Sequence, residues 1–86
     1  MSEFKDISGA RNFAAITTSD TVDNLLLDNG TPPKGIYVGV AGNVVAVDQD
    51  GTAVTFLGAI AGSILPIRPR RINATSTTAT DLVALY

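Results

Sequence analysis

Residues 35–71 decide the fold of this chain and read GIYVGVAGNVVAVDQDGTAVTFLGAIAGSILPIRPRR. Short segments rich in valine, isoleucine, threonine and aromatic residues alternate there with glycine turns, a pattern typical of β-hairpins and not of a helix. Gly42-Asn43 and Asp50-Gly51 are the turn signals, because a two-residue loop of either kind matches the twist of paired strands. The stretch therefore predicts a meander of strands over residues 36–40, 44–47 and 53–57.

Further strands are predicted on both sides of this meander. Residues 63–68 form one, which Pro66 and Pro69 restrict to a sheet edge or a bulge because proline cannot donate a ladder hydrogen bond. Residues 14–18 are expected to form the first strand. The predicted final hairpin pairs residues 70–74 with residues 81–86.

The size and composition of the chain favour an assembly over a lone domain. A chain of 86 residues allows one small domain, which buries only about 60 to 65 per cent of its unfolded surface. Without cysteine or histidine, neither disulfides nor a Cys/His zinc site adds stability. Because 45% of the residues are hydrophobic and 16% are charged, we expect other subunits to cover part of the apolar surface. Residues 1–13 are expected to form an arm, and residues 14–86 a single β domain.

Charge and residue types disfavour several functions. The net charge of −2 leaves no basic footprint for nucleic acid, and no apolar run approaches the roughly 20 residues that cross a bilayer. The start of the chain lacks a signal-peptide pattern, so we expect synthesis in the cytoplasm. No histidine is present to activate a serine or threonine hydroxyl, and no GxSxG turn occurs. We therefore expect no enzyme and no cofactor.

Two groups of carboxylates stand close enough together in sequence to be candidate cation sites. Asp48 and Asp50 stand in a turn that itself requires Asp and Gly, and the distal glutamate of a calcium loop is absent. Asp20, Asp23 and Asp28 have no histidine, cysteine or paired glutamate beside them. We expect solvated turns at both places and no metal site.

Three groups of residues are candidates for contacts between subunits. Arginine is enriched at protein interfaces and binds carboxylates through its fork of donors, which favours interface bonds over a solvated edge for the arginine cluster. The arm is too apolar for a solvated tail, so we expect it to lie on a neighbour, and a run of leucines is expected to line a subunit contact. The candidates are Arg68, Arg70 and Arg71 for the cluster, Phe4, Ile7 and Phe13 for the arm, and Leu25, Leu26 and Leu27 for the leucine run.

Short motifs follow one another in a characteristic order through the second half of the chain. They are GIYVG (35–39), DGTAVTF (50–56), GSILPIR (62–68), NATSTTAT (73–80) and LVALY (82–86). In this order and spacing the chain resembles, over residues 14–86, the spike base proteins on the heads of gene transfer agents and related tailed phages. The resemblance implies a small β protein that assembles as a ring on the capsid and seats a fibre or spike. Our own expectation is that the arm contacts the capsid or a neighbouring copy.

The expected fold is all-β, a small antiparallel β-sandwich or barrel of jelly-roll type with an extended N-terminal arm. The expected function is that of a virion structural protein on the phage head surface, assembled in the host cytoplasm as a homo-oligomeric spike or fibre base, with a pentamer favoured over a trimer. The expected partners are further copies of the chain, the major capsid protein and a spike or fibre protein, with no nucleic acid and no membrane. A capsid cement (decoration) protein or a small tail component is the alternative within this class. A glycan-binding β module, with Tyr37 near Asp48, is the alternative from another class.

Overall fold

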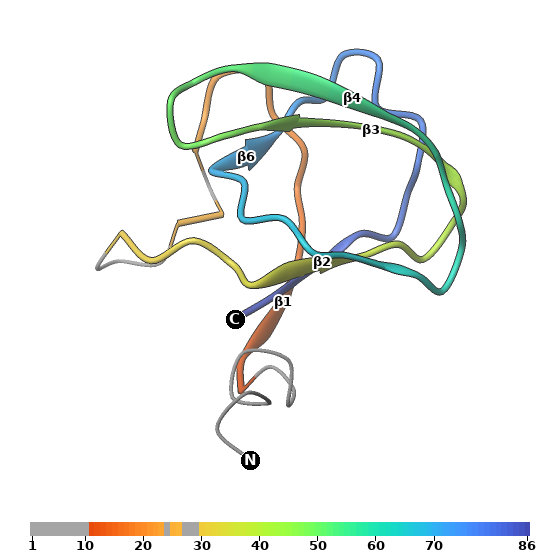
Figure 1. Cartoon of the computed structure of the whole chain (residues 1–86), viewed down its shortest axis with the longest axis horizontal. Coiled ribbons are helices and arrows are strands. Elements are labelled where there is room, and N and C mark those ends of the chain that lie inside the picture. The colour runs from red at the N-terminus through yellow and green to blue at the C-terminus, as the bar shows by residue number, and fades with distance from the viewer. Residues whose placement is uncertain (1–10, 24, 27–29) are drawn as a thin grey trace.

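Two antiparallel sheets enclose the core in the computed structural model, which describes residues 11–23, 25–26 and 30–86 (Figure 1). Within these described residues, one sheet has the strand order β1-β7-β2-β5 and the other the order β4-β3-β6. The strands are β1 (Phe13–Ala15), β2 (Gly35–Tyr37), β3 (Gly42–Val47), β4 (Ala53–Ala59), β5 (Ile64–Leu65), β6 (Arg71–Ile72) and β7 (Val83–Leu85). The expected all-β fold of antiparallel sheets is confirmed.

The two longest strands, β3 and β4, form the hairpin predicted at Asp50-Gly51. Asp48 Oδ1 accepts hydrogen bonds from the backbone N–H groups of Asp50 and Thr52, each over 2.9 Å. Gly51 has a φ of +90°, a conformation that glycine adopts without the strain of a side chain. The turn is specified by its own residues, which explains why the sequence predicts it correctly.

A β-bulge interrupts β4 near its end. Gly42 pairs with Ala59 and Val44 pairs with Phe56, so two steps along β3 face three steps along β4. Gly58 lies in this bulge with a φ of +67°. The extra residue shifts the alternation of side chains along β4, so that the side chain of Ala59 faces the core and is buried there.

Two predicted hairpins are wrong, because the strands involved pair with distant parts of the chain. β2 does not pair with β3 across Gly42-Asn43; it lies in the other sheet, between β7 and β5. β6 pairs with β3, whereas β7 pairs with β1 and β2, so residues 70–74 and 81–86 belong to different sheets. The edge position predicted for the strand before Pro66 is confirmed, since β5 ends its sheet.

Glycine is required where the chain crosses between the sheets after β2. A Cβ on Gly39 would lie 2.5 Å from the carbonyl oxygen of Asp81, and a Cβ on Gly42 would lie 2.5 Å from the backbone nitrogen of Ala79. Both contacts are with backbone, which cannot move aside as a flexible side chain can. The crossing therefore packs directly on the segment that leads into β7.

The core lies between the two sheets and takes side chains from both. Ile36 and Val38 come from β2 and the residue after it, while Val44 and Ile72 come from β3 and β6; all four are fully buried. Burying an aliphatic side chain of this size contributes about 1.5–3 kcal/mol. Among the described residues, the buried set contains no polar or charged side chain. Apolar packing across the two sheets therefore holds the domain together.

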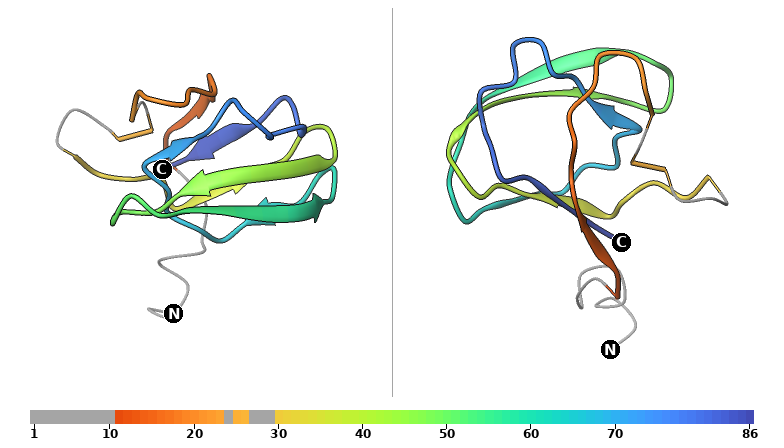
Figure 2. Two further views of the ribbon diagram at one scale, coloured as in Figure 1. Left: turned by 90° about the horizontal axis from the view of Figure 1, so that it is seen from above. Right: turned by 180° about the vertical axis from the view of Figure 1, so that it is seen from behind.

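The order of the strands is the one that remains when the second strand of an eight-stranded jelly roll is removed. The chain after β1 follows the path of that missing strand. The backbone N–H of Ser19 donates to the carbonyl of Ile72 in β6 over 2.9 Å. The side-chain oxygen of Ser19 accepts from the backbone N–H groups of Thr21 and Val22, which turns the chain away after this contact. Figure 2 shows the two sheets from above and from behind.

Candidate functional site

Two of the three arginines in the predicted cluster are held by one carboxylate of their own chain. Asp23 Oδ2 lies 2.7 Å from a terminal nitrogen of Arg70, and Asp23 Oδ1 lies 2.7 Å from a terminal nitrogen of Arg71. Arg70 also donates to the carbonyl of Gln49 over 3.1 Å, and Arg71 donates to the side-chain oxygen of Asn73 over 3.1 Å. Hydrogen bonds from Arg71 and then Arg70 lower the pKa of Asp23 from its ordinary value of 3.8. These two arginines thus fasten the chain after β1 to β6.

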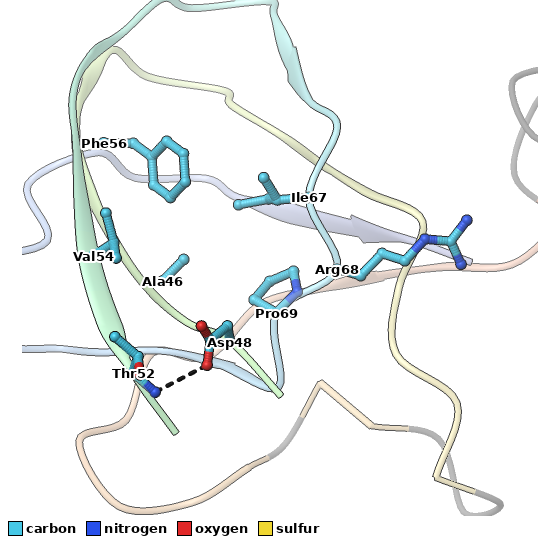
Figure 3. Close-up of a pocket in the computed structure, with 8 residues that line it drawn as sticks. All are labelled: Ala46, Asp48, Thr52, Val54, Phe56, Ile67, Arg68 and Pro69. Carbon is cyan, nitrogen blue, oxygen red and sulfur yellow. Dashed lines mark hydrogen bonds between the residues drawn. The ribbon is translucent and has the colours of Figure 1, made fainter. Parts of the chain in front are cut away.

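Arg68 differs from the other two arginines. Its side chain is exposed, and it forms no ion pair within the part of the chain that the structure describes. Gln49 Nε2 donates to the backbone carbonyl of Arg68 over 2.8 Å, so the backbone is anchored while the guanidinium extends outward. In Figure 3 that guanidinium points away from Phe56. A polar bond from Arg68 to another protein stays a prediction.

The leucine run divides between the core and the half-buried surface. Leu25 is only 2% exposed and packs in the core cluster, and its carbonyl accepts a hydrogen bond from the Tyr86 hydroxyl. Burial raises the pKa of that hydroxyl above its ordinary value of 10.0. A side chain this deeply buried offers no surface to a neighbouring subunit, so the role expected for Leu25 does not fit the structure. Leu26 is half-buried, and Leu27 lies outside the described residues.

The candidate residues of the arm are represented in the structure by Phe13. Phe13 lies in β1, which is one of the two outer strands of its sheet, and its side chain is 71% exposed. An aromatic ring with this exposure leaves apolar surface in water. Phe4 and Ile7 lie outside the described residues, so the contacts expected for them stay predictions.

Several exposed apolar side chains lie along β4 and the residues after it. Leu57 is 77% exposed, Ile60 is 71% exposed and Val54 is 50% exposed. β4 ends its sheet, so no described strand lies on its outer side. Its seven residues, AVTFLGA, contain no charged residue and no proline. Natural proteins use charges and prolines to prevent pairing at an exposed edge, and β4 has neither.

An apolar hollow opens between β4 and the connection from β5 to β6 (Figure 3). Its volume is about 310 Å³. Val54 and Phe56 form one wall, and Ile67 and Pro69 face them from the connection. Its one carboxylate, on Asp48, is already bonded within the hairpin turn. The hollow therefore fits apolar side chains better than it fits a polar ligand.

A second hollow continues along the same strand. Its volume is about 520 Å³, and its wall includes Leu57, Ile60 and Leu65. Phe56 lines both hollows, so the two hollows together lie along most of the length of β4. The two hollows and the uncovered strand form one surface, which we call the β4 edge, comprising residues 53–60.

Three of the described acidic residues, Asp20, Asp23 and Asp48, form hydrogen bonds within their own chain. Asp20 accepts hydrogen bonds from the backbone N–H and the hydroxyl of Thr75, over 2.9 and 2.6 Å, and these bonds lower its pKa from 3.8.

Among the described residues, no group of three or more His, Cys, Asp or Glu side chains gathers in a metal-binding arrangement. The described chain likewise has no helix with the length and apolar character to cross a membrane.

The β4 edge was missed from the sequence, although part of the signal is present. Alternation places Val54 and Phe56 on one face of the strand and Thr55 and Leu57 on the other, but it does not say which face meets the core. The absence of any charged residue from position 51 to position 67 was the available sign of an uncovered apolar edge.

Comparisons with known proteins give one informative match. No protein-family model and no curated protein matches the chain. Among solved structures, a chain from a structure described as "Capsid of native GTA particle computed with C5 symmetry" matches 95% of this chain, and the match covers 89% of the other chain. The two sequences are 36% identical and the TM-score is 0.78.

Proposed function

We propose that this chain, which belongs to the same family as a protein in the capsid of the native gene transfer agent (GTA) particle, is a virion structural protein of a phage-like head. The observation that carries the proposal is the agreement in both sequence and fold, at 36% identity and a TM-score of 0.78, over 95% of the chain. Agreement across nearly the whole of both chains means that the shared unit is the complete domain and not a common motif.

Within this role, the chain is the base of a spike or fibre on the head surface. It forms a homo-oligomeric ring bound to the major capsid protein and presents a seat to the spike or fibre protein. The C5 symmetry stated for the matched capsid supports a pentamer over a trimer. A small domain with an uncovered apolar strand gains stability when copies share that surface, which also supports a ring.

The geometry supports a mechanical function over ligand chemistry. The hollow beside β4 is lined mainly by apolar side chains, and the carboxylate of Asp48 is bonded in its turn. Of the two residues considered for a glycan site, Tyr37 lies in β2 of one sheet, and Asp48 directly follows β3 of the other sheet. These features support assembly contacts as the use of the surface.

Localisation on particles tests the proposal. Purified particles that carry an epitope-tagged copy of the chain are labelled with antibody and imaged by electron microscopy. Label on the head, together with loss of the head spike when the chain is deleted, is the expected result. Heads that keep their spikes but become fragile would favour a cement protein, and label on the tail would favour a tail component. Absence of the chain from particles would contradict a virion role.

A further inference from the structure

The two sheets present four outer strands, and two of them are closed to further pairing. β6 is covered by its own chain, because the N–H of Ser19 bonds to the carbonyl of Ile72 and Asp23 binds the arginines beside it. β5 contains only two residues and is followed directly by Pro66, which cannot donate to a ladder. Within the described residues, the outer strands that remain are β1 and β4.

The backbone of β4 has hydrogen-bonding groups directed outward. The N–H of Asn73 and the N–H of Arg70 donate to the carbonyls of Val45 and Val47, so those two residues of β3 turn their backbone groups toward β6. In an antiparallel ladder the residues opposite them then turn their own groups away from β3. The residues opposite are Thr55 and Ala53 in β4.

The backbone of β1 is arranged in the same way. The N–H of Ile16 donates to the carbonyl of Leu82, which makes that pair a hydrogen-bonded pair of the ladder with β7. Pairs alternate along an antiparallel ladder, so Phe13 and Ala15 direct their backbone groups away from β7. All three residues of β1 are exposed. Each open strand thus presents two outward residues spaced two apart.

We propose that β1 of one copy pairs along β4 of the next copy in the ring. This inference rests on the ring assembly proposed above. A closed ring needs two different, complementary surfaces on each copy, because a surface that pairs with itself stops at a dimer. β1 and β4 are different strands at the ends of different sheets, and neither contains a charged residue. The pair therefore supplies the two surfaces that a ring requires.

The side chains at the two strands fit this pairing. Phe13 on β1, and Leu57 and Val54 on β4, are the exposed large apolar residues of the two strands. The hollows beside β4 are apolar and accept side chains of an added strand, in the manner of known strand addition. Pairing one copy to the next satisfies the outward backbone groups of both strands and removes their apolar side chains from water.

Complementation between two blocked variants tests this pairing. Leu57→Lys places a charge on the β4 edge, and Phe13→Lys places one on β1; both positions are exposed, so both variants retain the fold. Val22→Lys is the matched control, because Val22 is 56% exposed and lies outside both strands. Each full-length variant is analysed by native mass spectrometry, alone and in an equal mixture in which one partner carries a ¹⁵N label.

The expected result is that the wild-type chain and Val22→Lys form the same closed oligomer and that each blocked variant loses it. The mixture forms a dimer with one copy of each variant and nothing larger, because only one intact pair of surfaces remains. Wild-type oligomers from both blocked variants would overturn the pairing and leave the ring standing. Loss in Leu57→Lys alone would show that β4 pairs with itself. A wild-type chain that is monomeric at every concentration tested would overturn the ring and with it the pairing.

Engineered cysteines give a second measurement that does not depend on blocking. The natural chain has no cysteine, so Ala15→Cys combined with Thr55→Cys introduces two defined thiols. A disulfide forms only where the two Cα atoms come within about 7 Å. Under mild oxidation we expect a ladder of covalent multimers, with the pair Ala15→Cys and Ala53→Cys testing the adjacent register. Val22→Cys with Thr55→Cys is the control, and equal cross-linking in this control would contradict the proposed contact.

Discussion

The two outer strands of the three-stranded sheet, β6 and β4, differ in how they are covered. At the β6 end, Ile72 is fully buried, its carbonyl is bonded to Ser19, and Asp23 fastens the covering segment through Arg70 and Arg71. At the β4 end, no described strand follows, and Leu57 is the most exposed of the large hydrophobic side chains in the described residues, at 77%. The same sheet thus has one edge that the chain covers itself and one that the described residues leave open.

The difference separates the residues that maintain the fold from those available for assembly. The covered edge at β6 contributes to the core, so substitutions there should change the free energy of unfolding of the isolated chain. The exposed side chains of the open edge contribute little to the stability of the isolated chain, because side chains that remain in water on folding gain no burial. Changes at the two edges should therefore have separate effects, on unfolding and on oligomerisation respectively.

The largest effect is expected from emptying the core at the covered edge. Ile72→Ala removes methylene groups from a fully buried site and should lower the free energy of unfolding by about 2–5 kcal/mol. Ile60→Ala makes the same chemical change at a position that is 71% exposed and should alter it by less than about 0.5 kcal/mol. Urea unfolding followed by circular dichroism measures both. An equal loss of unfolding free energy in the two variants would contradict the difference expected between the buried and the exposed position.

A somewhat smaller effect is expected where the chain crosses between the sheets. Gly42→Ala forces a Cβ to 2.5 Å from the backbone of Ala79 and should lower the free energy of unfolding by about 1–3 kcal/mol. Ala41→Ser, at the exposed neighbouring position, is the control and should stay within about 0.5 kcal/mol. Thermal unfolding of the two variants provides the measurement, and an unchanged midpoint for Gly42→Ala would show that the crossing is loosely packed.

The carboxylate that fastens the covering segment should make stability depend on acid. The pKa of Asp23 is lowered in the folded chain, so its contribution is fully present above the unfolded value near 3.8 and is lost as pH falls through the folded value. Asp23→Asn should therefore be less stable than wild type at pH 6, and the difference should shrink below about pH 4. Asp50→Asn, at the hairpin tip, is the control. The urea midpoint measured from pH 6 downward tests this, and a pH-independent difference would contradict it.

The smallest effect on the isolated chain is expected at the open edge. Leu57→Lys should change the free energy of unfolding of the monomer by less than about 0.5 kcal/mol, because the side chain is 77% exposed before the change. The measurement is urea unfolding at a concentration where the wild-type chain is monomeric. A loss comparable with that of Ile72→Ala would mean that β4 depends on Leu57 for its own folding.

Much of the fold can be predicted from local sequence. The hairpins that were predicted wrongly share one cause. Asp50-Gly51 specifies its turn with its own backbone and side chains, so the β3–β4 hairpin is predicted correctly. β2 looks like a partner of β3 because it is next to it in sequence, yet it pairs with β7 near the end of the chain. Local turn chemistry cannot report which distant strand completes a sheet. The pairing is decided by how the apolar faces of both sheets close over one core.

For the candidate site too, local features could be predicted from the sequence and long-range partners could not. Phe13 was identified from its apolar character in an otherwise irregular segment, and the structure places it on an open strand. Leu25 was misplaced because an apolar residue in a loop looks alike whether a neighbouring subunit or the chain's own core covers it. Arg70 and Arg71 find their carboxylate in Asp23, which is 47 residues from Arg70 in sequence. Such partners emerge only when the fold brings them together.

The most direct test of the account is a cryo-electron microscopy structure of the particle that carries this chain. We predict a ring of copies on the head surface, in which β1 of each copy runs beside β4 of its neighbour and Phe13 and Leu57 are covered. Copies bound singly to the capsid, with the β4 edge facing solvent, would contradict it.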